Sequence, residues 1–271
     1  MELNQPINRR IAGLIDTPLL WEKSLWEVEQ ESILQHEILP STSIVPHQSL
    51  RLGQLVEQYT FALLQENKEV QLLATNLQII ENKLTLGELD AIIRHRQQLI
   101  HLEISYKFYL YDDSVGDSEL AHWIGPNRRD SLVKKLTKLK EKQFPLLHHP
   151  VTQETLFQLG IDKQTIIQKV FFPAQLFIPL NCLSNKFSLI NRDCIVGFYL
   201  RKEQLVDFTR HQFYIPKKLD WLVHPHEEVE WLSHSDFLKI VENDFLLKQR
   251  SPLCWIKNEL QELHKIFLVW W

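Results

Sequence analysis

Apolar and polar residues alternate along residues 101–110, and this is the clearest pattern in the chain. One side carries Leu102, Ile104, Tyr106, Phe108 and Leu110, and the other carries His101, Glu103, Ser105, Lys107 and Tyr109. Because successive side chains of a strand point to opposite faces, the alternation predicts a strand with one buried face. A similar pattern precedes it, across a short polar turn. We therefore expect three strands, over residues 70–80, 84–95 and 98–112, the last two antiparallel neighbours.

A different spacing, typical of an amphipathic helix, occupies residues 48–66. The stripe that would face the sheet consists of Leu52, Leu55, Val56, Tyr59 and Leu63. The pattern predicts a second helix over 127–143 and a further strand over 168–179. Two apolar runs follow within 195–223, and the end of the chain, 254–271, is typical of a strand or hairpin. The loop 112–126 between strand and helix is polar.

Two acids stand on the neighbouring strands, Asp90 on the first and Glu103 on the second. Buried carboxylates are unfavourable unless a cation compensates them, and a divalent metal ion is the usual compensator. Lys107 follows on the face of Glu103, and Glu57 lies beside the apolar stripe of the first helix. Carboxylates that hold a metal ion next to a lysine are typical of enzymes that cleave phosphodiesters.

These motifs resemble those of a known superfamily. GELD at residues 87–90 and EISYK at 103–107 are similar to the PD-(D/E)XK nuclease signature. Further segments follow in order: RRIAGLIDTPLLW, RLGQLVEQY, HLEISYKFYL, WIGPNRRDSLVKKL and FYIPKKLDWL. Together they resemble a bacterial family, domain of unknown function 1853, usually placed in that superfamily. The resemblance spans nearly the whole chain.

The resemblance implies an α/β fold with a restriction-endonuclease-like core. Its central mixed β-sheet would be flanked by helices and joined by a C-terminal α/β extension. We expect an N-terminal helical lead-in over 1–44, the nuclease-like core over 45–180, and the extension over 181–271, packed on the same sheet.

The resemblance also assigns roles to residues. Asp90 and Glu103 would bind Mg²⁺ or Mn²⁺, with the carbonyl of Ile104 as a further ligand, and Glu57 or Glu88 would complete the site. The superfamily lysine acts on the attacking water, but its position holds Ser105 in this chain. Lys107 lies roughly 6.7 Å further along the strand. Two interpretations stay open: Lys107 acts from its displaced position, or the site does not catalyse.

A basic segment follows Pro126, with seven Lys or Arg between Arg128 and Gln143. Lys134, Lys138 and Lys142 recur every four residues and would share one helix face. A nucleic-acid backbone is one natural partner of such a surface, and a solvated basic face is the other interpretation. The candidate substrate-binding residues are Arg128, Arg129, Lys134, Lys135 and Lys138.

Composition limits the class of protein and the compartment in which we expect it. The net charge of −4 excludes a protein that coats polyanions over its whole surface. The three cysteines, Cys182, Cys194 and Cys254, form no CxxC pair, which favours a reducing compartment and gives no zinc signature. The apolar run after Arg9 and Arg10 ends at Asp16, so we expect a helix there rather than a signal peptide. We expect a cytoplasmic protein that does not span a membrane.

Two function classes result. The first is a metal-dependent nuclease that hydrolyses DNA or RNA. The second is a protein with a nuclease fold but no catalysis, which binds nucleic acid or a protein partner.

Overall fold

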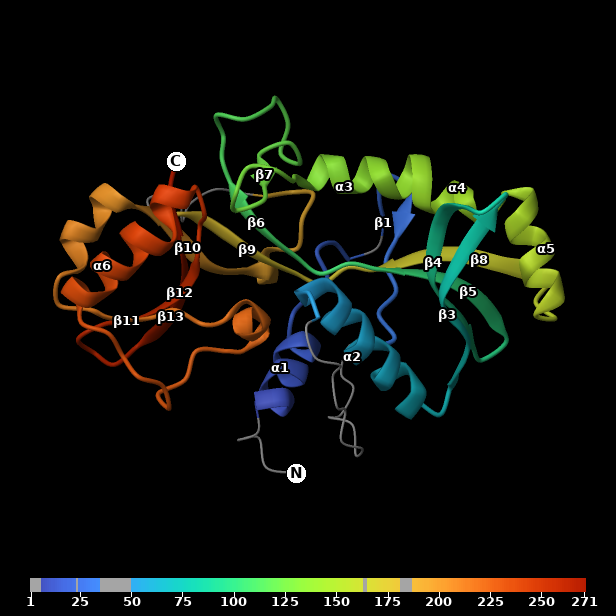
Figure 1. The fold of residues 1–271 in the computed structure, drawn as a ribbon, viewed down its shortest axis with the longest axis horizontal. Helices are drawn as coiled ribbons and strands as arrows, with labels where there is room; N and C mark the ends of the chain where they lie inside the picture. Colours follow the sequence, from blue (N-terminus) through green and yellow to red (C-terminus); the bar gives the residue numbers. More distant parts are fainter. Residues whose placement is uncertain (1–5, 23, 35–49, 163–164, 181–186) are drawn as a thin grey trace. The chain divides into compact units, whose positions relative to one another are not determined.

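The chain forms two compact units, each with its own β-sheet (Figure 1). The computed structural model describes residues 6–22, 24–34, 50–162, 165–180 and 187–271. Unit 1 comprises Leu19–Tyr106 and Lys134–Pro173, whereas unit 2 comprises Glu2–Pro18, Lys107–Val133 and Ala174–Trp271. Both units combine a mixed sheet with helices, so the α/β class is confirmed.

The sheet of unit 1 has four strands in the order β3-β4-β5-β8. Their bounds are Val70–Glu81, Leu84–His95, Gln98–Ile104 and Ile166–Phe171. β3 and β4 are antiparallel, as are β4 and β5, whereas β5 and β8 run parallel. The sequence therefore predicted correctly that β4 and β5 are neighbours in the middle of a mixed sheet.

Helix α2, Leu52–Glu66, packs against β3 in unit 1. Leu55, Val56, Tyr59 and Leu63 are buried, as their helical spacing predicted. Its apolar stripe is what holds the helix on the sheet, because burying such side chains is the main favourable contribution to packing.

A second helical segment, which lies in unit 1 from Lys134 onward, runs without interruption from α3 into two further pieces. α3 spans Leu132–Lys138, a π-helical turn spans Leu139–Gln143, and α4 spans Phe144–Leu146, with α5 following at Pro150–Gln158. The expected helix over 127–143 therefore begins later and extends further.

The core of unit 1 lies where α4 and α5 meet the sheet. It includes Ile79, Leu89, Ile92, Leu147 and Leu156. The glycine of the GELD motif contributes to this contact. A Cβ on Gly87 would lie 2.7 Å from Cδ2 of Leu146, so the glycine lets α4 approach β4 closely.

Unit 2 contains a sheet of seven strands in the order β11-β12-β13-β10-β9-β6-β7. These are, in chain order, β6 Lys107–Tyr111, β7 Trp123–Ile124, β9 Ala174–Pro179, β10 Ile195–Arg201, β11 Gln212–Tyr214, β12 Leu253–Lys257 and β13 Leu263–Val269. The final hairpin, β12 against β13, is antiparallel as expected. Helix α6, His234–Asp244, covers a core that includes Phe213, Phe237 and Ile266.

Short elements complete both units. β1, Ser24–Leu25, pairs with β2, Val28–Glu29, in unit 1. The expected helical lead-in over 1–44 is helical in α1, Pro6–Ile15, which belongs to unit 2. Unit 2 also has four 3₁₀ turns among its described residues: η3 Arg192–Cys194, η4 Lys202–Phe208, η5 Lys218–Leu222 and η6 Leu246–Lys248.

Two predicted strands are each divided in the structure. The expected strand 98–112 is wrong, because β5 ends at Ile104 in one sheet and β6 begins at Lys107 in the other. The expected strand 168–179 divides in the same way, around Pro173. β5 pairs in parallel with β8, and β6 pairs in parallel with β9. Both segments leave the first sheet and enter the second, which alternation alone does not reveal.

The C-terminal strands correct a further expectation. They do not extend the sheet that carries Asp90 and Glu103, but build the seven-stranded sheet together with β6, β7 and β9. The polar loop over 112–126 contains the short strand β7, which pairs with β6.

Candidate active site

Asp90 and Glu103 lie on neighbouring antiparallel strands at the centre of the unit 1 sheet. Ala91 pairs with Leu102 in the ladder between β4 and β5, and the same register places Asp90 opposite Glu103. The backbone N–H of Ile104 donates to Oδ2 of Asp90 at 2.7 Å. The two acids are therefore positioned by the sheet itself, and a backbone hydrogen bond fixes the Asp90 carboxylate.

Glu103 is fully buried, with polar partners at both carboxylate oxygens. Its Oε1 lies 3.1 Å from Nε2 of His101, and the side-chain amide of Gln143 donates to Oε2. Gln168 lies 3.0 Å from the other ring nitrogen of His101. The polar face of β5 is thus covered by the π turn and α4, because Gln168 also donates to the carbonyl of Phe144.

Further acids surround this pair. Burial raises the pKa of Asp90 to about 8, and the negative charges of Glu103 and Glu57 act in the same direction. The pKa of Glu57 is also raised, first by burial and then by Glu88 and Glu103. Lys135 opposes both shifts. We call Glu57, Glu88, Asp90 and Glu103 the acid cluster.

The acid cluster offers hard oxygen donors of the kind that Mg²⁺ and Mn²⁺ prefer. Within the residues that the structure describes, no three His, Cys, Asp or Glu side chains are arranged to hold one ion together. Mg²⁺ often uses only one or two carboxylates and completes its octahedron with water and substrate phosphate. Asp90 and Glu103, with the carbonyl of Ile104, fit such an open site in donor chemistry.

The lysine expected beside these acids has another partner. Lys107 opens β6 in unit 2, where its Nζ donates to Oδ2 of Asp130 at 2.6 Å. Ser105 is buried just after β5, and its backbone N–H donates to the carbonyl of Phe171. The expectation that Lys107 lies on the same strand face as Glu103 is wrong, because β5 ends between the two residues.

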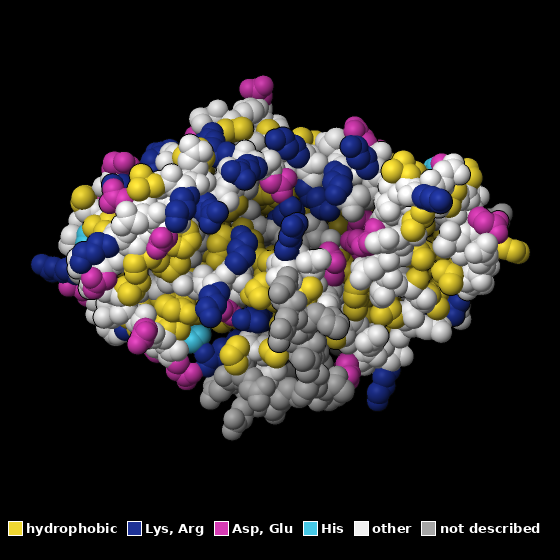
Figure 2. All heavy atoms as spheres, in the orientation of Figure 1, with side chains coloured by type: hydrophobic (Ala, Val, Ile, Leu, Met, Phe, Trp, Pro, Cys, Tyr) yellow, Lys and Arg dark blue, Asp and Glu magenta, His cyan; other side chains and the backbone are white. Residues whose placement is uncertain are grey.

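The predicted substrate-binding residues fall into two groups. Lys134 and Lys138 are exposed on the helix and Lys135 is half-buried, and Figure 2 shows Lys and Arg side chains gathered over α3. Arg128 and Arg129 are exposed residues of unit 2. Arg128 pairs with Asp112 at 2.9 Å, and its guanidinium lies 4.3 Å from the centre of the Trp271 ring.

The family described as Domain of unknown function (DUF1853) matches residues 9–269, which is nearly the whole chain. The chain belongs to this family. Comparison with curated proteins gives no match, and neither does comparison with solved structures. Among the residues described, no helix is both long and apolar enough for a membrane span. The match confirms the expected membership of DUF1853, and the family description names no activity.

Two polar residues of this DUF1853 site were not predicted. His101 shares the polar face of the strand with Glu103, so the alternation itself contained a signal for it. Gln143 had no comparable signal, because its approach to Glu103 depends on the π turn. The cysteines lie away from this site: Cys194 and Cys254 are buried in unit 2, and Cys182 lies outside the described residues.

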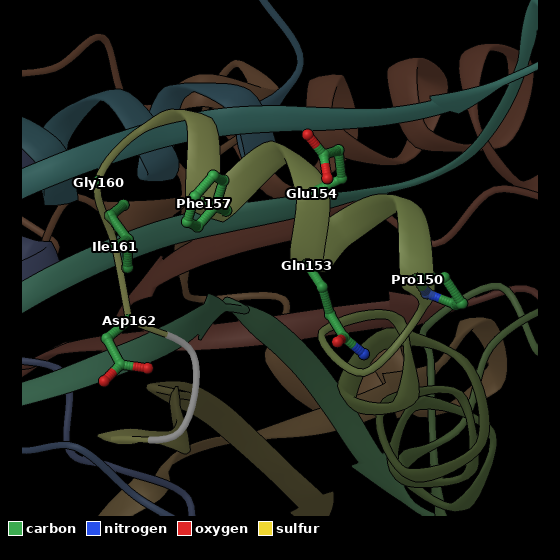
Figure 3. Close-up of a pocket in the computed structure, with 7 residues that line it drawn as sticks. All are labelled: Pro150, Gln153, Glu154, Phe157, Gly160, Ile161 and Asp162. Atoms are coloured by element: carbon green, nitrogen blue, oxygen red, sulfur yellow. The ribbon is translucent and has the colours of Figure 1, made fainter.

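A separate hollow of unit 1 does not include the acid cluster. It is formed by α5 and the loop after it, with Phe157 and Ile161 beside the acids Glu154 and Asp162 (Figure 3). Its remaining lining residues are Pro150, Gln153 and Gly160. The acids with raised pKa, Asp90 on β4 and Glu57 on α2, lie elsewhere, so we place the candidate site at the acid cluster.

Proposed function

We propose that this chain is a metal-dependent nuclease of the PD-(D/E)XK type, which hydrolyses phosphodiester bonds of DNA or RNA. The observation that carries the proposal is the placement of Asp90 and Glu103 on neighbouring central strands, with Glu57 close enough to repel them. Clustered acids with little compensation are costly to bury. A bound divalent cation removes this cost and explains why such a cluster exists.

The chain's own residues would prepare this site. Asp90 and Glu103 would hold Mg²⁺ or Mn²⁺ with the carbonyl of Ile104, and Glu57 would hold a second ion beside it. The bound ion would supply Lewis acidity and lower the pKa of a water molecule. His101 and Gln143 orient the carboxylate of Glu103, and the N–H of Ile104 orients that of Asp90. Such supporting contacts fix ligands in place.

The exposed lysines of α3 support a nucleic-acid substrate. Lys134 and Lys138 face solvent on the helix that also brings Gln143 to Glu103. Lysines near a phosphodiester backbone position it without reading its sequence. Charge reversal at Lys134 and Lys138 should therefore weaken binding and flatten its dependence on salt concentration.

A second function, binding without catalysis, is favoured by one observation. Ser105 occupies the lysine position of the superfamily signature, and Lys107 is engaged by Asp130. If no other lysine serves the site, the fold would bind nucleic acid or a protein partner and leave it intact.

Cleavage assays with Mg²⁺ and with Mn²⁺, on single- and double-stranded DNA and RNA, separate these functions. The parent protein is expected to cleave, whereas Asp90→Asn and Glu103→Gln each remove a ligand and abolish cleavage. Glu154→Gln, an exposed acid of the same unit, is the matched control and should behave like the parent. Binding without cleavage under either metal would favour the second function, and absence of both activities would overturn the proposal.

A further inference from the structure

One lysine does approach the acid cluster, and it comes from the helix rather than from the strand. Lys135 of α3 donates from Nζ to Oε1 of Gln143 at 3.0 Å. The amide of Gln143 in turn donates to Oε2 of Glu103. A hydrogen-bonded connection therefore leads from the ammonium of Lys135 to a predicted metal ligand, and all three residues belong to unit 1.

The π turn aligns these side chains. Residues eight positions apart on a regular α-helix are rotated by about 80° from one another. Between Lys135 and Gln143 the helix contains the π turn Leu139–Gln143, and Phe144 N–H bonds to the carbonyl of Leu139. The extra residue in that turn rotates Gln143 back toward the face of Lys135. Such π turns are rare and often occur at functional sites.

Burial separates Lys135 from the other lysines of its helix. Lys134 and Lys138 are exposed, whereas Lys135 is half-buried. Its positive charge acts on both Asp90 and Glu57, which lie on β4 and α2. Two elements of unit 1, β4 and α2, thus carry acids close enough to interact with this ammonium. A solvated basic helix face, the alternative for this segment, does not account for an inward lysine bonded to Gln143.

We infer that Lys135 is the lysine of the proposed phosphodiesterase centre, and that it stabilises the negative charge that develops on the phosphate during cleavage. The inference rests on the proposed function and deepens it. In the reaction, water's oxygen forms a bond to phosphorus while the bond to the leaving sugar oxygen breaks. One proton of the water ends on that leaving oxygen through solvent. Lys135 stays protonated throughout and donates hydrogen bonds to a non-bridging phosphate oxygen.

The decisive experiment compares Lys135→Ala with Lys107→Ala in the Mn²⁺-dependent cleavage assay. We expect Lys135→Ala to lower kcat by about 100-fold with little change in KM, because the contact is made mainly in the transition state. Lys107→Ala should lower kcat far less. Lys135→Arg, or a small alkylamine added to Lys135→Ala, should restore part of the rate. Lys68→Ala, an exposed lysine of the same unit, is the control.

A second measurement is independent of turnover. Mn²⁺ should raise the Tm of Lys135→Ala at least as much as that of the parent, because the acids that would bind it remain. Lys135→Met keeps the apolar stem and replaces the alanine variant if that variant fails to fold. Loss of the Mn²⁺ shift in a folded Lys135 variant would mean that the lysine only holds the site together, and would overturn the assignment.

The outcomes test the nuclease function and the role of Lys135 separately. A parent that cleaves, with a Lys135→Ala variant that cleaves equally well, leaves the nuclease proposal standing and overturns the role of Lys135. Loss of cleavage in Lys107→Ala and not in Lys135→Ala would likewise leave the nuclease proposal standing and overturn the role of Lys135. A parent that cleaves nothing with either metal overturns the proposed function, and the role of Lys135 with it.

Discussion

Each unit buries charge in the middle of its sheet, but the two do so differently. In unit 2, Lys265 of β13 is 4% exposed, and its Nζ donates to Oε1 of Gln175 at 2.9 Å and to the carbonyl of Trp221 at 3.0 Å. In unit 1, Asp90 faces other acids, and the backbone N–H of Ile104 donates a hydrogen bond to it. The lysine is surrounded by acceptors, whereas the acid is surrounded by like charge.

This difference separates a structural group from a functional candidate. Lys265 joins β13 to β9 and to the end of η5, so its polar contacts are already complete within the fold. Burial of clustered acids is unfavourable as it stands, and the fold tolerates it where a ligand can compensate. Burial alone does not mark a site; burial of a charge beside like charges does.

The largest expected effect comes from breaking the unit 2 network. Lys265→Met should lower the free energy of unfolding by about 3 kcal/mol, because it removes the hydrogen bonds that Lys265 donates to buried acceptors on Gln175 and Trp221. Urea unfolding measures the change. Wild-type stability in this variant would mean that the network contributes nothing and that the contrast between the units is false.

Metal ions should raise the free energy of unfolding by binding to unit 1. At ten times its Kd, Mg²⁺ or Mn²⁺ should stabilise the folded protein by about 1.4 kcal/mol, which raises Tm by a few degrees. Asp90→Asn should lose this shift and Lys265→Met should keep it. Thermal melts with and without the metal measure this shift. A Tm that does not change in millimolar Mn²⁺ would count against the metal site.

Asp90 and Lys265 should give opposite pH dependences in metal-free buffer. The pKa of Asp90 is raised from 3.8 to about 8, so the native state keeps a proton that the unfolded state loses, and stability falls as pH rises between these values. Burial lowers the pKa of Lys265 from 10.5 to about 7, so stability rises with pH across that interval.

Unfolding free energies of Asp90→Asn and Lys265→Met test this pair of slopes. Each variant should remove its own slope, less than about 1.4 kcal/mol per pH unit, and leave the other. The windows are pH 4.5–6.5 for Asp90 and pH 8.5–10 for Lys265, since each lies within the interval of only one of these two groups. Lys218, whose pKa burial also lowers to about 7, contributes equally to the slopes of parent and variant. Equal slopes in variant and parent would contradict the assignment.

The smallest effect is expected at the pair between Lys107 and Asp130. Their side chains are 32% and 40% exposed, so water screens the interaction. Lys107→Ala should change the free energy of unfolding by about 0.5 kcal/mol. A loss of several kcal/mol in chemical denaturation would place Lys107 among the structural groups, beside Lys265.

Local patterns predicted much of unit 1. The stripe on α2 and the alternation on β4 and β5 were sufficient, because both periodicities arise from backbone geometry and need no knowledge of the partner. They placed Asp90 and Glu103 on adjacent central strands. The alternation failed to predict strand ends where a segment passes from one sheet to the other. Alternation continues through Ser105 and Tyr106 although the hydrogen-bonding partner changes from β8 to β9. Pro173 was a visible signal for the matching break.

The sequence by itself determined which acids meet, since their strands are joined by a short turn and the register follows from it. It did not determine which lysine lies near them. Lys107 is close to Glu103 in the chain, but the end of β5 assigns it to another sheet. Lys135 is distant in sequence and reaches the acids through Gln143 because one helical turn is a π turn. Only the tertiary structure decides such contacts, because they depend on how separate elements pack rather than on any local periodicity.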